Sequence, residues 1–472
     1  MKVEGPGDRT TWGAEPDAAL AVERQRLLDH GPRRLREAAL AITEAAIARG
    51  DPLRGTLLKV RREGERLWVD GHDYDLRSVG RIWVVGAGKA SLAIAAALEQ
   101  VLGEHLTGGV IVTKKGDDRG LRRIEVIAGG HPIPDTDSMR GARRMLEVAR
   151  EAGRDDIVFC AVTGGSSALA SLPPPGVSLA DLQELYRMLL HCGEPIEVIN
   201  VVRRHACMVK GGRLIEAIDP ALAITLTLDT APEGMPWPDM CLPDPSTFED
   251  TVRILQEVGL WARTPTSIRA HLQQGLHNGE LETIKDFSGF RTQMVFVGDP
   301  VSVCDAAAAR AKELGFSPVV LGTFIGGEAR EVAVAMAGIA REVLERDRPA
   351  AAPCALISGG ETTVTIEGDA GLGGPNQEFA VAFAVAMGRR APFACASLDT
   401  DGTDGPTEIA GGLTDHTTVD RAAAAGIDLV DCLRRHATAS ALETLDDAVV
   451  TGHTGTNLQN IRAIVLGTRQ DR

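Results

Sequence analysis

The sequence has few features of a membrane, nucleic-acid-binding or secreted protein. No apolar run approaches the roughly 20 residues of a membrane-spanning helix, and the N-terminal segment is acidic and polar, without a signal-peptide core. The formal net charge of -15 disfavours nucleic acids and anionic membranes, which proteins bind with an excess of Lys and Arg. We therefore expect a cytoplasmic protein with neither nucleic-acid nor membrane partners.

Paired cysteines and three common catalytic signatures are also missing. The eight cysteines show no C-x-x-C spacing, which excludes the usual zinc and disulfide frameworks and predicts buried thiols at Cys160 and Cys395. No G-x-S-x-G elbow is present, which argues against a hydrolase of that type. The sequence VVGAGKAS at 84–91 is neither a Walker A loop nor a complete dinucleotide fingerprint, because Ser91 replaces the third glycine.

What remains is the composition of a large globular enzyme. A chain of 472 residues exceeds what one hydrophobic core usually supports, so we expect two domains. Apolar runs that end in glycine turns alternate with helical patterns, and this alternation predicts a parallel sheet with helices on both faces. A second α/β pattern follows residue 286. The more polar segment 248–286 is interpreted as a linker, and an amphipathic helix is expected at 17–49.

Two glycine turns are candidate anion sites. VVGAGKAS leads from a strand through Lys89 into a helix, and TGGSSAL closes another strand at Thr163 and opens another helix. Backbone N–H groups at helix starts attract phosphate or carboxylate groups, and lysine adds a mobile cation. A plain turn with a solvated lysine fits the first pattern equally well, and an N-capped helix fits the second.

A basic cluster and an acidic loop are further candidates. INVVRRHACMVKGGRL at 199–214 gathers basic residues, and a spacing of two helical turns places Arg203 and Lys210 on one face. A solvated helix flank is the alternative. SLDTDGTDG at 397–405 gathers carboxylates that suit Mg²⁺ and its phosphates, although Asp and Gly are also ordinary turn residues.

The order of these loops resembles the class II glycerate 2-kinase family. The resemblance covers about residues 25–470, including the C-terminal part called the MOFRL domain, and rests on the segments VVGAGKAS, AGGHPIPDTDS, TGGSSAL, INVVRRH, VKGGRL, PDPSTFED, ISGGETTVTIEG, GGPNQE, TDGTDGPTEIAGG and TGHTGTN. It implies a Rossmann-like N-terminal domain at 25–285 after a flexible tail at 1–24, a smaller MOFRL-like α/β domain at 286–472, and an active site in the cleft between them.

The resemblance also implies ATP and Mg²⁺ as cofactors and phosphorylation of a small hydroxylated substrate. A homodimer is a possible assembly. The predicted catalytic residues are Lys89 and Asp229. The predicted cofactor-binding residues are Gly86, Gly88, Gly164, Gly165, Ser166, Ser167, Gly359, Gly360, Glu361 and Asn376. The predicted substrate-binding residues are His131, Asn200, Arg203 and Lys210, and the predicted metal ligands are Asp399, Asp401 and Asp404.

Several loops depart from the family pattern. Pro375 stands where the family has an arginine, and the loop after Asp229 introduces Met235 and Trp237 in place of a glycine-serine loop. Because proline offers neither charge nor N–H, these changes predict weaker glycerate binding and a larger substrate, such as a sugar acid or a nucleoside-like compound. The alternatives are an ordinary glycerate 2-kinase, a non-catalytic nucleotide- or metabolite-binding relative, and an NAD(P)-linked reductase, which the incomplete fingerprint disfavours.

Overall fold

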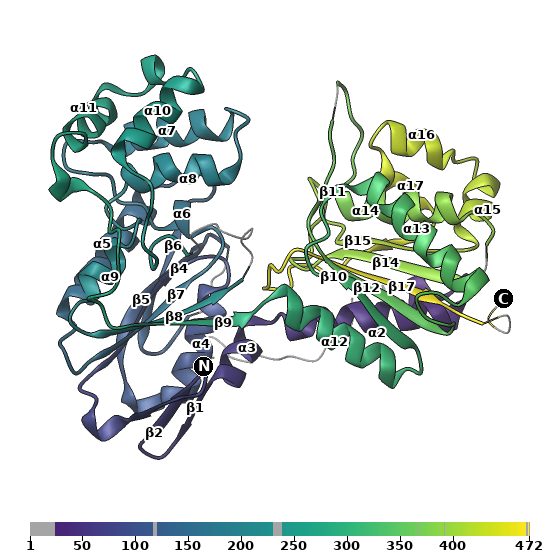
Figure 1. Ribbon diagram of the computed structural model, residues 1–472, viewed down its shortest axis with the longest axis horizontal. Coiled ribbons are helices and arrows are strands. Elements are labelled where there is room, and N and C mark those ends of the chain that lie inside the picture. Colours follow the sequence, from purple (N-terminus) through teal and green to yellow (C-terminus); the bar gives the residue numbers. More distant parts are fainter. Residues whose placement is uncertain are drawn as a thin grey trace, which may run out of the picture. The chain divides into compact units, whose positions relative to one another are not determined.

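The computed structural model describes residues 24–116, 120–229, 238–366, 368–390, 392–468 and 471. The chain forms two compact units (Figure 1). Pro52–Val297 make up the first, called here the parallel-sheet unit. The described residues of Met1–Asp51 and of Gly298–Arg472 make up the second, called the mixed-sheet unit.

The parallel-sheet unit is built on a six-stranded sheet with the order β6-β5-β4-β7-β8-β9, in which β6, β5, β4, β7 and β8 run parallel. The sheet strands are β4 (Ile82–Ala87), β5 (Leu106–Lys114), β6 (Ile124–Gly129), β7 (Ile157–Val162), β8 (Leu222–Leu228) and β9 (Thr292–Gly298). A small antiparallel sheet is formed by β1 (Val60–Glu63), β2 (Arg66–Val69) and β3 (His72–Asp75). The predicted α/β class with a parallel sheet is confirmed.

Helices cover this sheet because its central strands are apolar on both faces. Every residue of β7 is buried, as expected for a parallel strand between two helical layers. One core cluster joins the sheet to α5 (Thr136–Glu151) and α9 (Arg213–Ile218), while α4 (Ser91–Leu102) packs with α3 (Pro52–Lys59) and β1. Helix α5 begins with a capping box between Asp135 and Ser138, which fixes where the loop after β6 ends.

The segment 248–286 is not a linker. It contributes α10 (Phe248–Glu257) and α11 (Thr266–Gly275), which pack with α7 (Leu179–Leu190) and α8 (Ile196–His205) in a second core of the same unit. Phe248 is buried in this core, between the rings of His205 and His271. The polar composition of the segment reflects the outer faces of these amphipathic helices.

The mixed-sheet unit contains a six-stranded sheet with the order β10-β12-β17-β14-β15-β16. β10 and β12 are parallel, whereas β17 runs antiparallel to both of its neighbours, β12 and β14. The strands are β10 (Ser317–Gly322), β11 (Gly327–Glu328), β12 (Cys354–Gly360), β13 (Thr362–Thr363), β14 (Phe393–Asp399), β15 (Gly411–Asp415), β16 (Ala448–Val449) and β17 (Asn460–Leu466). The helices are α2 (Arg33–Arg49), α12 (Pro300–Glu313), α13 (Ala329–Arg346), α14 (Pro375–Met387), α15 (Thr418–Ala424), α16 (Leu429–Arg434) and α17 (Thr438–Thr444).

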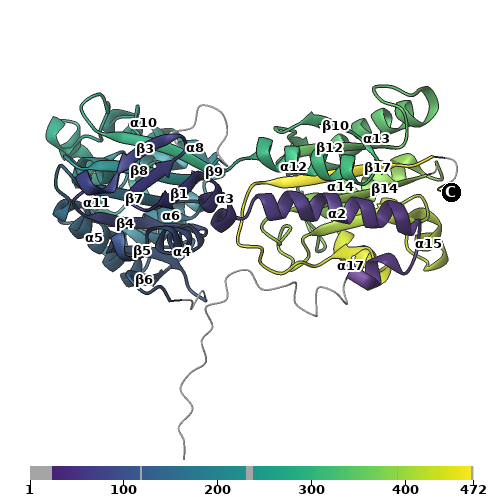
Figure 2. The ribbon, with the colours of Figure 1, turned by 90° about the horizontal axis from the view of Figure 1, so that it is seen from below.

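Helix α2 belongs to the mixed-sheet unit, although it precedes the whole parallel-sheet unit in the sequence. It packs beside α12 and against β17 and β14 (Figure 2). Arg36 of this helix is fully buried and pairs with Asp415 and Asp447, which are also fully buried. In the described part of the expected helix at 17–49, Gly31 with φ +65° and Pro32 interrupt the helical pattern.

The division of the chain therefore differs from the predicted boundaries at two places. Helix α2 lies with the C-terminal residues, because its apolar face covers their sheet, and β9 completes the parallel sheet, because it lies next to β8. Local periodicity identified both elements but not the sheets on which they pack. Among the described residues, no helix is long and apolar enough to cross a membrane.

Candidate active site

The first candidate site lies at the carboxyl edge of the parallel sheet, between β4 and β7. The chain continues from β4 to β5 on one side and from β7 to β8 on the other, so the loops after β4 and β7 diverge. Open α/β sheets bind ligands at such a switch point. The two loops are VVGAGKAS and TGGSSAL, so the fold brings the two predicted anion-binding turns together.

Hydrogen bonds join these two loops directly. The Lys89 N–H donates to the Gly164 carbonyl at 2.8 Å, and the Ala90 N–H donates to Thr163 Oγ1 at 3.0 Å. Glycine is required at Gly88, whose φ is +144° and where a Cβ would lie 2.1 Å from Thr163 Oγ1. The side chain of Lys89 is exposed, which leaves its ammonium group available to an anion.

A histidine from a third loop completes the same corner. Gly165 has φ +87° and precedes the short helix α6 (Ser166–Leu169). A Cβ at Gly165 would lie 3.3 Å from ring atoms of His131 and 3.4 Å from Lys89 Cγ, so these three residues are neighbours. The buried Ser166 Oγ has no hydrogen-bond partner among the described residues. A buried hydroxyl without a partner beside a lysine is consistent with a site that is completed by a polar ligand.

The electrostatic surroundings of His131 are positive. Although part of the His131 residue is exposed, desolvation of its ring lowers its pKa, and the charges of Lys89, Arg203 and Lys114 lower it further. Because several cations disfavour a further positive charge, the imidazole is neutral near pH 7. An anion bound here would relieve this repulsion.

Arg203 and Asn200, both on α8, are buried, and Arg203 lies near enough to His131 for its charge to lower the pKa of that histidine. The Arg203 guanidinium stacks on the Tyr186 ring, 4.6 Å from its centroid, and Arg203 Nε has no hydrogen-bond partner among the described residues. Asn200 Oδ1 also has none. The helix thus presents a cation with unused donor capacity, as the sequence predicted for a substrate site.

Lys210 does not have the role that its helical spacing predicts. Helix α8 ends at His205, so Arg203 and Lys210 do not share a helical face. Both side chains instead lie against the Tyr186 ring. Lys210 is fully buried, and its ammonium donates to the Ser167 carbonyl at 2.6 Å, to Ser167 Oγ at 2.7 Å and to the Tyr186 hydroxyl at 2.5 Å. With all three donors used, Lys210 holds the TGGSSAL turn rather than a substrate.

Asp229 directly follows β8, at the same carboxyl edge as the two candidate anion-binding turns. A carboxylate at this place could accept the proton of a reacting hydroxyl group. Its catalytic role remains a prediction. Met235 and Trp237 lie outside the described residues.

The second candidate site is an acidic edge of the mixed sheet, where β12 and β14 end and the antiparallel β17 begins. Asn460 starts β17 and lies opposite both Gly360 and Asp399 in the strand register. Its Nδ2 donates to Asp399 Oδ2 at 3.3 Å. Its Oδ1 accepts from the Thr362 N–H at 3.3 Å and from Arg462 Nη2 at 2.8 Å.

Carboxylates crowd this edge. Burial raises the pKa of Asp399 to about 8, and the negative charges of Asp401, Asp404 and Glu361 contribute to the rise. The pKa of Glu361 is also raised, by desolvation and by Asp401. Crowded carboxylates share a proton or attract a cation, so this edge is a candidate site for a positive ion.

The three predicted metal ligands do not form one metal centre. In the described parts of the chain, no three His, Cys, Asp or Glu side chains are arranged to hold a metal ion. Asp404 accepts hydrogen bonds from the N–H groups of Asn376 at 3.0 Å and Gln377 at 2.9 Å, and therefore caps the first turn of α14. The Asn376 side chain is equally occupied, because it bonds to Asp404 and Ser397 and is fully buried. Pro375 takes the first helical position of α14, where no N–H is needed.

Three of the predicted glycines have a packing role of their own. Gly86 lies inside β4, where a Cβ would lie 2.2 Å from the Ala161 carbonyl oxygen. Gly360 has φ +106°, and a Cβ there would lie 2.3 Å from Ile325 N. At Gly359 a Cβ would come within 3.1 Å of Cys304 Sγ. Close packing explains these glycines without a ligand, and their cofactor-binding roles remain predictions.

Four residues at the two sites were not singled out from the sequence. Tyr186 connects the basic cluster to the TGGSSAL turn, and Thr362, Asn460 and Arg462 organise the acidic edge. Thr362 and Asn460 lie within or just after glycine-rich segments of the sequence that resemble the family, so their polar side chains could have been predicted as site residues. Nothing in the local pattern identifies Tyr186 or Arg462.

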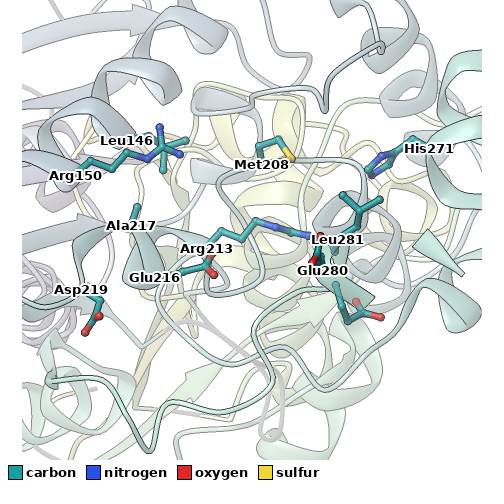
Figure 3. A pocket seen from close by; sticks show the side chains of 11 residues that line it. Leu146, Arg150, Met208, Arg213, Glu216, Ala217, Asp219, His271, Glu280 and Leu281 are labelled. Carbon is teal, nitrogen blue, oxygen red and sulfur yellow. Dashed lines mark hydrogen bonds between the residues drawn. The ribbon is translucent and has the colours of Figure 1, made fainter. Parts of the chain in front are cut away.

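A separate cavity of about 410 Å³ lies elsewhere on the parallel-sheet unit (Figure 3). Figure 3 shows Arg213 near the centre of its lining, between Arg150 on one side and His271 on the other. Arg213 Nη1 donates to the carbonyl oxygens of Cys207 and Lys210, which gives it a structural role. None of the predicted site residues lines this cavity.

Comparison with known proteins agrees with this geometry. Residues 38–273 match a domain of unknown function, DUF4147, and residues 354–460 match the MOFRL family. The chain is 37% identical over 440 residues to a glycerate 2-kinase of Pyrococcus horikoshii, covering 93% of this chain and 99% of that protein. It is 37% identical over 393 residues to a D-glycerate 2-kinase of Thermotoga maritima, covering 81% and 90%.

A solved structure shares the fold as well. The crystal structure of a glycerate kinase from Thermotoga maritima superposes with a TM-score of 0.80 at 34% identity, covering 92% of this chain and 99% of that one. The two candidate anion-binding turns and the acidic edge thus lie on a scaffold shared with glycerate kinases. The chain belongs to the class II glycerate 2-kinase family and is a phosphotransferase with an alcohol group as acceptor.

Proposed function

We propose that the protein is a glycerate 2-kinase, which transfers the γ-phosphoryl group of ATP to the 2-hydroxyl of glycerate. The proposal is supported by the similarity to glycerate 2-kinases along nearly the whole chain. The larger, non-glycerate substrate expected from the loop changes is not supported. Pro375, on which that expectation depended most, fits the start of α14 as an ordinary helix-initiating residue.

The observation that carries the proposal is the cationic corner at the switch point of the parallel sheet. Lys89, His131 and the TGGSSAL turn are neighbours there, and Arg203 contributes positive charge. Phosphoryl transfer needs positioning and charge neutralisation more than covalent assistance. We assign the exposed Lys89 ammonium and the turn amides to the anionic groups of the reactants.

Asp229 is assigned to the acceptor hydroxyl. A carboxylate at the end of β8 can accept the proton that this hydroxyl loses when its oxygen attacks phosphorus. The proton then resides on Asp229 until product release. This role predicts that removing the carboxylate lowers kcat more than it weakens substrate binding.

The acidic edge is assigned to the Mg²⁺ that accompanies ATP. Mg²⁺ is typically held by one or two protein carboxylates, while water and substrate phosphates complete its octahedral shell. The edge fits this demand, because Asp399 and Asp401 are close and Glu361 is adjacent, yet no closed protein cage is formed by the described residues. When bound there, the ion would neutralise phosphate charge.

An assay with ATP, Mg²⁺ and D-glycerate tests this function, with ³¹P NMR to distinguish 2-phosphoglycerate from 3-phosphoglycerate. We expect 2-phosphoglycerate as the product. A panel of larger sugar acids and nucleosides is assayed in parallel, together with NADH and hydroxypyruvate for the reductase alternative. Higher kcat/KM with a larger hydroxy compound, NADH-dependent reduction, or nucleotide binding without any phosphorylated product would each contradict the proposal.

A further inference from the structure

Arg462 is a fully buried arginine on β17, the strand between β12 and β14 in the mixed sheet. Alternate residues of a strand share one face, and on this face Ile464 and Leu466 belong to the apolar core with Phe379. The Arg462 guanidinium lies over the Phe379 ring, 4.9 Å from its centroid. An apolar side chain would suit the packing of this position.

The buried charge of Arg462 feels the negative charges of Asp404 and Asp399, but it makes no direct ion pair with them. Its Nη2 donates to Thr362 Oγ1 at 2.7 Å and to Asn460 Oδ1 at 2.8 Å, but Nε and Nη1 have no hydrogen-bond partner among the described residues. No carboxylate forms an ion pair with Arg462 within the part of the chain that the structure describes. Burying an unpaired charge opposes folding, so stability alone does not explain this residue.

Arg36 is the natural comparison in the same unit. It is equally buried, but its three guanidinium nitrogens donate to the Leu27 carbonyl, Asp415 and Asp447. Arg36 therefore has the environment of a structural arginine. The difference between these two arginines is that only Arg36 has carboxylate partners.

The partners that Arg462 does have lead directly to the acidic edge. Asn460 Oδ1 is held by Arg462 and Thr362, which fixes the amide so that its Nδ2 points to Asp399 Oδ2. Thr362 immediately follows Glu361 and accepts the second Arg462 hydrogen bond. Arg462 thus fixes the residue that orients Asp399 and the residue that follows Glu361.

We propose that Arg462 is a positioning residue for magnesium-nucleotide binding: through Asn460 it orients the carboxylate of Asp399 toward the ion, and through Thr362 it holds the backbone next to Glu361. The inference rests on the proposed assignment of Mg²⁺ to the acidic edge. Groups that orient metal-binding carboxylates influence affinity without touching the ion. Arg462 itself contacts neither substrate nor nucleotide.

Arg462→Met tests the role, because methionine fills the core without the charge. Isothermal titration calorimetry with ADP and Mg²⁺ measures affinity independently of turnover. We expect the dissociation constant to rise about tenfold or more, as is typical when such orienting contacts are lost. The melting temperature is expected to stay the same or to rise, because an unpaired buried charge has been removed. Arg462→Lys, which can still donate to Asn460, should recover part of the affinity.

Arg36→Met is the matched control. It removes one partner of a buried ion-pair network, so the melting temperature should fall by about 6 °C or more while MgADP affinity in the folded protein is unchanged. A lower melting temperature with unchanged MgADP affinity in Arg462→Met would instead mean that Arg462 is only structural, and would overturn the proposal. If Arg462→Met does not fold, Asn460→Ala takes its place, and unchanged MgADP affinity in that variant overturns the proposal.

The outcome separates this inference from the proposed function. MgADP binding that depends on Arg462, without phosphorylation of glycerate, would reject the function and keep the inference. Normal glycerate phosphorylation together with unchanged MgADP affinity in Arg462→Met would reject the inference and keep the function. Absence of MgADP binding by the unmodified protein would overturn the inference.

Discussion

Two lysines that share the same predicted chemistry have opposite environments. Lys89 is exposed at the carboxyl edge of the parallel sheet, whereas Lys210 is fully buried with its three donors occupied. An exposed ammonium group can change partners when a ligand arrives, but a buried and saturated one cannot do so without leaving Ser167 and Tyr186 unsatisfied. At the residue scale, the local environment therefore distinguishes a lysine that can bind a ligand from a lysine that holds the protein structure.

Replacing Lys89 should affect catalysis without affecting stability. In Lys89→Met we expect kcat/KM for glycerate to fall by about 100-fold or more, because a cation that faces developing phosphate charge is lost. The melting temperature should be unchanged, because the side chain is exposed. Steady-state kinetics and calorimetric melting measure the two effects, with the exposed Lys312→Met as control. A drop of less than threefold would contradict the assignment.

The lowered pKa of His131 predicts a pH dependence of substrate binding. In the free protein its pKa lies below 6.5, because desolvation and neighbouring cations disfavour the imidazolium. A bound anion favours the imidazolium, so binding takes up a proton and glycerate affinity should increase as the pH falls from 8 to 6. Calorimetry in buffers of different ionisation enthalpy measures this proton uptake. His131→Gln should abolish it, and equal uptake in the variant would assign the proton to another group.

The same histidine contributes to stability with a defined sign. A depressed pKa in the folded state means that the unfolded chain binds its proton first as the pH falls. The contribution of His131 is thus fully present above about pH 6.5 and is lost as the pH falls toward its folded pKa. In thermal melts between pH 8 and 5, the melting temperature of the unmodified protein should fall relative to that of His131→Gln as the pH is lowered.

At the scale of elements, the acidic loop combines two carboxylates with different tasks. Asp404 caps α14 through backbone N–H groups of its first turn, while the Asp401 carboxylate, among the described residues, accepts hydrogen bonds only from Thr403 in its own loop. The sequence pattern of Asp and Gly residues contains no distinction between them. The two carboxylates have different roles because the first turn of α14 lies next to Asp404.

This division predicts opposite effects of two neighbouring substitutions. Asp404→Ala should lower the free energy of unfolding by about 2 kcal/mol or more, because buried donors at the start of α14 lose their acceptor. Asp401→Ala should leave stability within about 0.5 kcal/mol and weaken MgADP binding instead. Denaturant unfolding and calorimetric titration of both variants give the comparison. If Asp401→Ala is the more destabilising variant, the assignment is reversed.

At the scale of the whole molecule, the two units are not consecutive pieces of sequence. The mixed-sheet unit needs α2 from the N-terminal region, because Arg36 compensates the buried charges of Asp415 and Asp447 and the helix covers β17 and β14. The parallel-sheet unit, Pro52–Val297, contains its own two cores. The chain therefore leaves one unit and returns to it.

Fragments should reflect this arrangement. Residues 52–297 alone are expected to melt cooperatively, whereas residues 298–472 alone should not, because the buried carboxylates of Asp415 and Asp447 would lose Arg36 and keep only Arg421 as an arginine partner. Joining residues 24–51 to 298–472 through a flexible Gly/Ser linker of about 15 residues should restore cooperative melting. Circular dichroism melts of the three fragments provide the measurement, and cooperative melting of 298–472 by itself would show that α2 is dispensable.

The sequence by itself determined the α/β class, the parallel sheet and the two turns at its carboxyl edge, because strand periodicity and strand-to-turn glycines act over a few residues. The sequence also identified the family, because the loops that resemble this family follow one another in the same order along nearly the whole chain. Tertiary structure alone decided which sheets β9 and α2 pack on. It also decided that Lys210 and Asp404 hold other parts of the protein in place, and that Arg462 is buried next to the acidic edge without an ion-pair partner. These features depend on burial and on partners distant in sequence, and both exist only after the chain has folded.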